Sequence, residues 1–257
     1  MKLIDTHTHL YEEAFDADRD DMIARAFDAG VKKMIIPNVD SSTVDGMLLL
    51  CEKYPAAIFP MIGLHPCYVK PETYNEELHK VKAALDTKKF YAVGEIGIDL
   101  YWDKTTLNIQ KEAFSLQMDW AIEKNLPVAV HSRDSLDVLI NLCKQRASNL
   151  PKGVFHCFTG SHEDARTLIE MGFYLGIGGV ITYKNNNALR ETVAKIPLKY
   201  IVLETDSPYL PPVPYRGKRN ESAYTKIVAE QLALIYGKTL DEIAAITSQN
   251  AAFLFGI

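Results

Sequence analysis

Short runs of β-branched and other apolar residues recur along the whole chain, and most of them lack polar residues at alternate positions. Strands that are buried on both faces of a parallel sheet have this pattern. The pattern predicts eight strands, over residues 2–6, 33–37, 58–63, 90–96, 127–131, 153–156, 173–177 and 200–204.

Stretches with helical spacing lie between these runs. Over residues 106–124, Ile109, Ala113, Leu116 and Trp120 fall on one stripe, as in an amphipathic helix. Further helices are expected before Gly30, over 163–170, over 223–236 and, as a closing element, over 240–255. Eight strands that alternate with helices over about 250 residues predict an α/β fold, a single (β/α)8 TIM barrel that occupies residues 1–257 as one domain.

An open, doubly wound sheet is the alternative fold. Such a sheet is expected to carry a glycine-rich dinucleotide fingerprint after its first strand, and the chain has none there. No linker, charge block or internal repeat divides the chain. The barrel is therefore the preferred interpretation.

Composition narrows the class of protein. Of the 257 residues, 47% are hydrophobic and 24% are charged, which is ordinary for a globular protein and excludes global disorder. The four cysteines show no C-x-x-C spacing, so neither a zinc finger nor a disulfide framework is expected. The beginning of the chain lacks a signal-peptide pattern, and no apolar run has the length of a membrane span. We expect a cytoplasmic protein with free thiols and no membrane association.

Two histidines at the end of the first expected strand are the first candidates for chemistry. His7 and His9 are two residues apart, so in an extended chain both imidazoles project from the same face and can bind one ion.

Four more candidate ligands follow other strands. Glu95 is expected at the end of the fourth strand, His131 of the fifth, His156 of the sixth and Asp206 of the eighth. The carboxyl ends of barrel strands converge on one mouth, where the active sites of such barrels lie. Four histidines and two acids would therefore line one cavity, and a purely structural role does not require that set.

Six nitrogen and oxygen ligands are too many for one tetrahedral ion and suit two divalent ions that share a carboxylate. We expect His7, His9 and Asp206 around one ion, His131 and His156 around the other, and Glu95 as the bridge. This donor set fits Mg²⁺, Mn²⁺ or Zn²⁺. Two such ions would lower the pKa of a bound water and clamp a phosphate, and Asp206 could collect the released proton. Asp206 and Glu95 are thus the expected catalytic residues of a hydrolase.

These residues stand in motifs that resemble the TatD family of metal-dependent deoxyribonucleases. The motifs are His7-Thr8-His9, Gly63-Leu64-His65-Pro66, Gly94-Glu95-Ile96-Gly97 with Asp99, His131-Ser132-Arg133, His156-Cys157-Phe158-Thr159-Gly160, Glu204-Thr205-Asp206-Ser207-Pro208-Tyr209-Leu210 and Arg216-Gly217-Lys218-Arg219-Asn220-Glu221. The resemblance implies an amidohydrolase-type barrel, a divalent-metal site and hydrolysis of DNA phosphodiesters by a 3′–5′ exonuclease acting on single-stranded ends. Many members have Asn-Glu-Pro where this chain has Asn220-Glu221-Ser222, a departure that touches no expected ligand.

Other polar and aromatic residues are expected around the same mouth. His65 follows the third strand and is expected either to contact substrate phosphate or to make a structural hydrogen bond. Four cations in mouth loops could bind phosphate oxygens: Arg133, Arg216, Lys218 and Arg219. Four aromatic residues could either stack on nucleobases or pack within their loops: Tyr101, Trp102, Phe158 and Tyr209.

Two other functions remain open. A hydrolase of amides or carboxylic esters, aminoacyl-tRNA esters included, could use the same ligands; a lysine at the bridging position would favour it, whereas Glu95 favours the nuclease. A catalytically silent nucleic-acid scaffold would not need the complete ligand set. The net charge of −5 excludes broad coating of a duplex. Two divalent ions and the nearby cations could still make a positive pocket for single-stranded DNA ends, in a monomer without an obligate protein partner.

Overall fold

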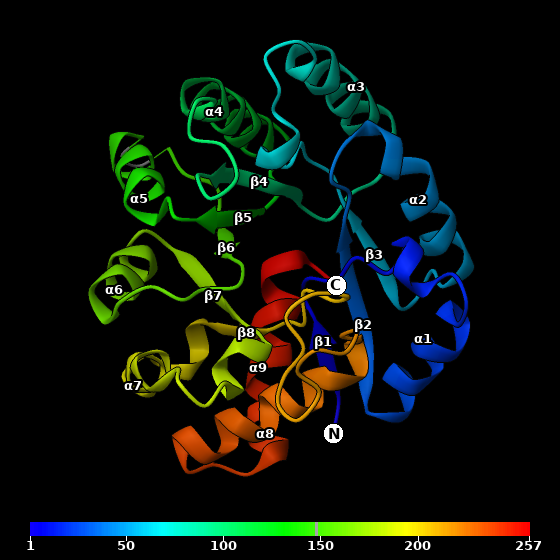
Figure 1. Ribbon diagram of the computed structural model, residues 1–257, viewed down its shortest axis with the longest axis vertical. Helices are drawn as coiled ribbons and strands as arrows, with labels where there is room; N and C mark the ends of the chain where they lie inside the picture. Colours follow the sequence, from blue (N-terminus) through cyan, green and yellow to red (C-terminus); the bar gives the residue numbers. More distant parts are fainter. Residues whose placement is uncertain (147–148) are drawn as a thin grey trace.

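The strands of the chain form a closed parallel barrel with helices around it (Figure 1). The computed structural model describes residues 1–146 and 149–257. The eight strands are β1 (Leu3–Asp5), β2 (Val31–Pro37), β3 (Ile58–Met61), β4 (Val93–Asp99), β5 (Val128–Arg133), β6 (Gly153–Phe155), β7 (Phe173–Ile177) and β8 (Ile201–Leu203). The predicted TIM barrel is confirmed.

Two runs of parallel strands make up the barrel, β1-β2-β3 and β4 through β8 in sequence order. They meet at two seams. Ile62, just past β3, bridges to Val93 of β4, and Thr8, just past β1, bridges to Ser207 beyond β8. The N–H of Thr6 also donates to the carbonyl of Leu203, at 2.9 Å. The barrel is therefore closed by backbone pairing on both sides.

The helices expected before Gly30 and over 106–124, 163–170, 223–236 and 240–255 are present, and further helices follow the other strands. Within the described ranges they are α1 (Arg19–Asp28), α2 (Val44–Lys53), α3 (Tyr74–Thr87), α4 (Leu107–Lys124), α5 (Leu136–Gln145), α6 (His162–Glu170), α7 (Asn187–Ala194), α8 (Thr225–Tyr236) and α9 (Leu240–Phe255). Asn125 and Gly237, both left-handed, end α4 and α8, and Thr239 with Glu242 forms a capping box at the start of α9. In the described part of the chain, none of the helices combines the length and apolar character that crossing a membrane requires.

Helix α9 closes one end of the barrel and leaves the other end for the site. Figure 1 shows it across the barrel opening, and its Ser248 and Asn250 side chains donate to the carbonyls of Lys2 and Ile201, where β1 and β8 begin. The barrel interior at this end is apolar. Its buried side chains are Ile4, Ile35, Phe59, Met61, Ala92, Ala129, Val154, Val202, Ala251, Leu254 and Phe255.

One expected strand is displaced. The run over residues 90–96 predicts a strand that ends at Glu95–Ile96, but β4 begins at Val93 and continues to Asp99, so Glu95 lies inside the strand. The strand continues through Gly97, a residue type that is generally unfavourable within strands. In the structure Gly97 pairs with His131 of β5 at a φ of 151°, and a Cβ there would come within 2.0 Å of the His131 carbonyl oxygen. Only glycine permits this close pairing.

Candidate metal centre

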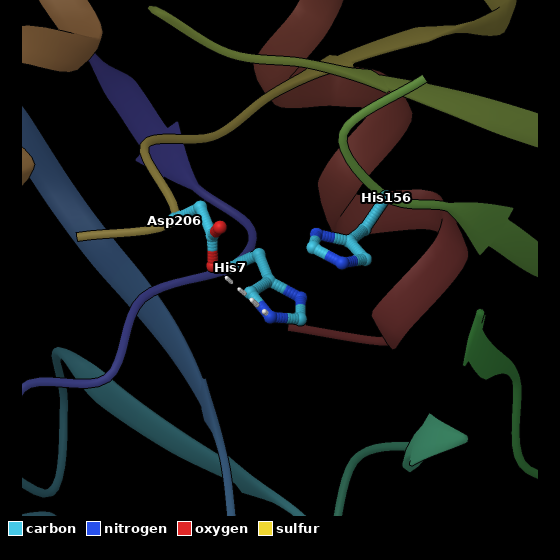
Figure 2. Close-up of side chains that lie close together, drawn as sticks. All are labelled: His7, His156 and Asp206. Atoms are coloured by element: carbon cyan, nitrogen blue, oxygen red, sulfur yellow. Dashed lines mark ion pairs between the residues drawn. The ribbon is translucent and has the colours of Figure 1, made fainter. Parts of the chain in front are cut away.

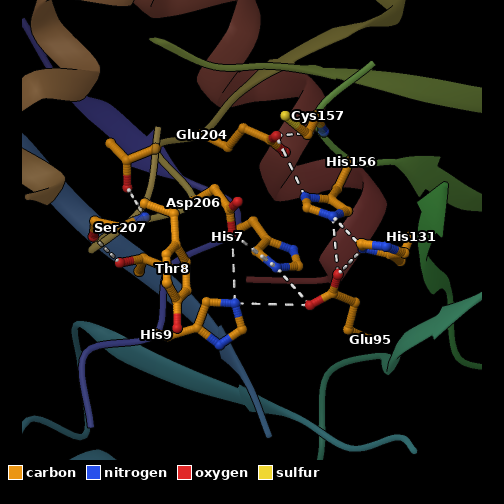
Figure 3. Close-up of polar contacts among 12 residues, drawn as sticks. His7, Thr8, His9, Glu95, His131, His156, Cys157, Glu204, Asp206 and Ser207 are labelled. Atoms are coloured by element: carbon orange, nitrogen blue, oxygen red, sulfur yellow. Dashed lines mark hydrogen bonds and ion pairs between the residues drawn. The ribbon is translucent and has the colours of Figure 1, made fainter. Parts of the chain in front are cut away.

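The six expected ligands come together at the carboxyl-terminal mouth of the barrel (Figure 3). His7 and His9 directly follow β1, His131 lies in β5, His156 follows β6, Asp206 follows β8, and Glu95 points inward from the middle of β4. His7, His9, Glu95 and His156 are buried. The structure thus brings together the six residues that were expected at strand ends, although Glu95 lies inside its strand.

Glu95 stands between two pairs of imidazoles. Its Oε2 lies 3.1 Å from Nε2 of His7 and 3.7 Å from Nε2 of His9. Its Oε1 lies 2.8 Å from Nδ1 of His131 and 2.9 Å from Nε2 of His156. Each carboxylate oxygen therefore faces its own pair of ring nitrogens, the arrangement of a carboxylate that can serve two ions at once.

Asp206 belongs to the His7 and His9 side. Its Oδ1 lies 3.5 Å from Nε2 of His9 and 3.8 Å from Nε2 of His7, and its backbone N–H donates to the His7 carbonyl at 2.9 Å. Figure 2 shows Asp206 beside His7, with the His156 ring next to that of His7; the two imidazole rings stack with centroids 4.0 Å apart.

These side chains fit divalent metal ions. Three sets of donor atoms each lie within 4.8 Å of one another: His7, His156 and Asp206; His7, His9 and Glu95; and His65, Glu95 and His131. Such mixed imidazole and carboxylate sets suit Zn²⁺, Mn²⁺ or Mg²⁺. Among the described residues, the buried Nδ1 atoms of His7 and His156 have no hydrogen-bond partner. Burying polar ring nitrogens without a partner costs free energy of folding, and a bound cation would offset this cost.

The buried carboxylates and imidazoles of the centre shift one another's pKa values. Burial alone would raise the pKa of Glu95, but the imidazoles of His156, His65 and His7 outweigh it and hold the pKa well below its usual range. Burial, together with the neighbouring His156, lowers the pKa of His7. Burial alone would lower the pKa values of His9, His131 and His156, but the neighbouring carboxylates raise them. Metal ligation needs neutral imidazoles, so a bound cation would displace the protons that these rings hold.

Comparison with known proteins identifies the family. The family model for TatD related DNase matches residues 4–256. This chain belongs to the TatD family. It is 41% identical to the Bacillus subtilis metal-dependent hydrolase YabD over 99% of each chain. It is 32% identical to the Salmonella typhimurium 3′-5′ ssDNA/RNA exonuclease TatD, again over 99% of each. The crystal structure of the TatD homologue YjjV from Escherichia coli superposes with a TM-score of 0.92, at 33% identity, over 99% of this chain and 98% of that one.

The resemblance that the motifs suggested is therefore confirmed at the level of the family. As a TatD-family protein, the chain is a metal-dependent hydrolase with clusters of histidine, glutamate and aspartate that can hold metal.

His65 joins the centre of this TatD-family hydrolase. Its Nε2 lies 3.4 Å from Oε1 of Glu95, its ring centroid is 4.5 Å from that of His131, and its Nδ1 accepts the N–H of Cys67 at 3.1 Å. The structural hydrogen bond that the sequence left open is thus present, and the other ring nitrogen still faces the centre.

Two further buried carboxylates lie beside ligand histidines, and neither was among the expected site residues. Oδ2 of Asp99 lies 2.9 Å from Nε2 of His131. Oε1 of Glu204 accepts the N–H of Cys157 and lies 3.6 Å from Nδ1 of His156. The Asp99 carboxylate can therefore fix the tautomer and ring orientation of His131. The distance from Glu204 to His156 is too long for a hydrogen bond, so Glu204 contributes charge beside His156. Asp99 ends β4 and Glu204 follows β8, so their position at strand ends is the sequence signal that places both at the same mouth.

The four expected cations occupy different surroundings. The Arg219 guanidinium pairs with Asp18, at 2.7 and 2.8 Å, and covers the Phe15 ring, so the geometry gives no support to a phosphate contact by this residue. Arg216 lies over the Tyr183 ring, 4.0 Å from its centroid, and Lys218 is exposed. Arg133 lies over Tyr101, as described below.

Of the four aromatic residues, Phe158 is buried in the core, so for this residue the packing alternative holds and stacking on a base is excluded. Tyr101, Trp102 and Tyr209 are exposed, and the Tyr209 ring centroid lies 6.1 Å from that of His9.

Proposed function

We propose that the chain, acting as a single domain over residues 1–257, is a deoxyribonuclease that removes nucleotides from the 3′ end of single-stranded DNA. The observation that carries the proposal is the position of Glu95, with each carboxylate oxygen facing a separate pair of imidazoles. The similarity to the Salmonella exonuclease TatD, over nearly the full length of both chains, supports nucleic acid as the substrate.

In this proposal the centre holds two divalent ions. His7, His9 and Asp206 hold one ion, His131 and His156 hold the other, and Glu95 serves both. Divalent ions act as Lewis acids on phosphate oxygens and make water a nucleophile near neutral pH. The donor set fits Mg²⁺, Mn²⁺ or Zn²⁺.

Asp206 is placed to accept the proton that hydrolysis releases. Burial alone would raise its pKa, but the hydrogen bond with His9 and the charges of His156 and His7 lower it below its usual range. Its carboxylate is therefore ionised at neutral pH. Its side chain keeps 15% of its surface exposed toward the mouth, whereas that of Glu95 keeps 3%. Asp206 can thus exchange a proton with solvent, and Glu95 is restricted to holding the ions.

The substrate contacts in this proposal lie on the rim of the mouth. His65 and Arg133 are the nearest groups for phosphate oxygens, since one touches Glu95 and the other follows His131 by two residues in β5. Arg216 and Lys218 add positive charge on exposed loops. The ions and these cations would give a positive mouth on a body of net charge −5, which suits capture of one strand end.

The test combines metal analysis with cleavage. Protein loaded with each ion is incubated with single-stranded oligonucleotides that carry a label at the 5′ or the 3′ end. We expect two ions per chain and stepwise shortening from the 3′ end. Glu95→Gln should lose at least about a thousandfold in rate, because one bridging charge serves both ions. The matched control is Glu112→Gln on the exposed face of α4.

Two results would overturn the proposal. One is intact DNA under every divalent ion while aminoacyl esters or amides are hydrolysed, which would assign the centre to the alternative chemistry. The other is equal cleavage by wild type and the Glu95 variant, which would trace the activity to a contaminant.

A further inference from the structure

Two large aromatic rings stand exposed on the loop between β4 and α4. Tyr101 is 54% and Trp102 is 71% exposed, and their rings meet edge to face with centroids 4.9 Å apart. The Arg133 guanidinium carbon lies 3.7 Å from the Tyr101 ring centroid and 5.4 Å from that of Trp102. Tyr101, Trp102 and Arg133 together are called the aromatic platform here. Exposed apolar rings of this size cost hydration free energy unless something covers them.

The loop that carries the platform is firmly held. Oδ1 of Asp99 accepts the backbone N–H groups of Tyr101 and Trp102, at 3.0 and 3.3 Å. The buried Gln110 side chain accepts the N–H of Asp99 at 2.8 Å and donates to its carbonyl at 3.1 Å. These bonds fix the backbone from which both rings project. The rings are therefore presented in a defined position, which lowers the entropic cost of binding a ligand on them.

The same carboxylate ties the platform to the metal centre. Oδ2 of Asp99 contacts Nε2 of His131 at 2.9 Å, and Nδ1 of His131 contacts Oε1 of Glu95 at 2.8 Å. Arg133 follows His131 by two residues in β5. The side chains of Asp99 and His131 thus connect the platform loop to the Glu95 carboxylate in the metal centre.

The chemistry of the platform selects one class of ligand. Aromatic faces with an adjoining guanidinium bind nucleobases by stacking, and the guanidinium adds attraction to phosphate. We propose that the aromatic platform stacks an unpaired nucleobase of the strand whose phosphate is hydrolysed at the metal centre. The proposal rests on the proposed function for the identity of the substrate. It also predicts a preference for unpaired bases, because bases within a duplex are covered by their neighbours and cannot reach Trp102.

Tryptophan fluorescence tests the platform directly. The chain has two tryptophans, and the second, Trp120 in α4, is only 7% exposed. The metal-loaded protein is titrated with a phosphorothioate-linked deoxyadenosine pentamer and with an abasic pentamer of the same backbone charge. We expect the base-bearing pentamer alone to quench the emission strongly. Trp120→Phe should keep this quenching and Trp102→Ala should lose it, with binding of the pentamer weaker by about 5- to 150-fold, the usual range for one stacked base.

Equal quenching by the two pentamers, or unchanged affinity in Trp102→Ala, would overturn the proposal. Metal content and hydrolysis of bis(4-nitrophenyl) phosphate, a substrate too small to span the platform and the centre, report whether the centre of each variant is intact. If the pentamer binds through Trp102 but DNA is never cleaved, the proposed function fails and the platform stands. If DNA is cleaved with the same KM by Trp102→Ala, the platform fails and the proposed function stands.

Discussion

Replacing Asp99 by asparagine should separate two sets of hydrogen bonds that this carboxylate makes, one to the following loop and one to His131. Oδ1 accepts two backbone N–H groups of the following loop, and Oδ2 lies 2.9 Å from Nε2 of His131. As an acceptor, Oδ2 keeps the imidazole proton on Nε2. The lone pair of Nδ1 is then directed toward Glu95 and available to a cation.

An asparagine amide can preserve only one of these sets of hydrogen bonds. If its oxygen stays on the backbone N–H groups, its NH₂ group faces His131 Nε2, the imidazole proton moves to Nδ1, and the ligand lone pair is lost. If the amide turns, two backbone hydrogen bonds are lost at about 1 kcal/mol each. The second route keeps the ligand lone pair and lowers the stability of the loop. The first route agrees with the 10- to 100-fold loss of metal affinity that follows removal of such a partner. That loss corresponds to about 1.4 to 2.7 kcal/mol.

Calorimetric titration of metal-free protein with Mn²⁺ measures the effect, which we expect in the weaker of two binding steps. The matched control is Asp103→Asn. This substitution removes the same charge from the same loop, but Asp103 accepts bonds from Thr105 and not from a histidine. Unchanged affinity in the Asp99 variant, or the same loss in both variants, would refute the reasoning.

Three further predictions follow from other parts of the structure. Chelation with EDTA should abolish hydrolysis and lower Tm, and excess divalent ion should restore both. At an ion concentration of 100 times Kd, the expected stabilisation of the folded state is about 2.7 kcal/mol. A Tm that does not depend on ion concentration would contradict this prediction. Gly176→Ala should reduce metal affinity and destabilise the fold by about 1 to 3 kcal/mol in denaturant unfolding. The new Cβ would come within 2.2 Å of Glu204 Oε2 and 3.1 Å of the His156 Cα. Gly172→Ala, where no atom lies within 4 Å but φ is 91°, is the control for backbone strain alone. The Arg219 and Arg25 guanidiniums hold the pKa of Asp18 below its usual range, so the stabilisation from this ion pair is present above pH 4 and is lost as the pH falls through the lower folded value. Asp18→Asn should therefore lower stability by up to about 1 kcal/mol at pH 7, with the difference from wild type shrinking below pH 4 in thermal melts.

The sequence predicted the barrel well because its strands are buried on both faces and leave uninterrupted apolar runs. Strand β4 extends past its expected end, through Gly97 to Asp99. Glycine is needed at position 97 because a Cβ there would clash with the His131 carbonyl on the neighbouring strand, a contact that the sequence does not show. Pairing between strands, which a single apolar run does not encode, decides where such a strand ends.

The candidate centre was predictable for a related reason. In a parallel barrel, the position of a residue just past a strand determines which end of the molecule it occupies, so six scattered residues could be placed together. Side-chain partners could not be placed this way. Arg219 follows the same logic as Arg133, yet Asp18, from a segment about 200 residues away in sequence, engages it. The partner of a long side chain depends on which groups lie near it in the folded chain, and strand order alone does not predict this.

The seam between β1 and β8 has a consequence for protein synthesis. Thr8 and Ser207, which bridge this seam, are 199 positions apart, and His7 and Asp206 stand directly beside them. A nascent chain therefore carries His7 and His9 long before Asp206 is made. α9, which closes the opposite end of the barrel, must emerge from the ribosome later still. Hydrolytic competence should thus appear only after α9 has been made and has closed the barrel, which keeps molecules without this helix inactive.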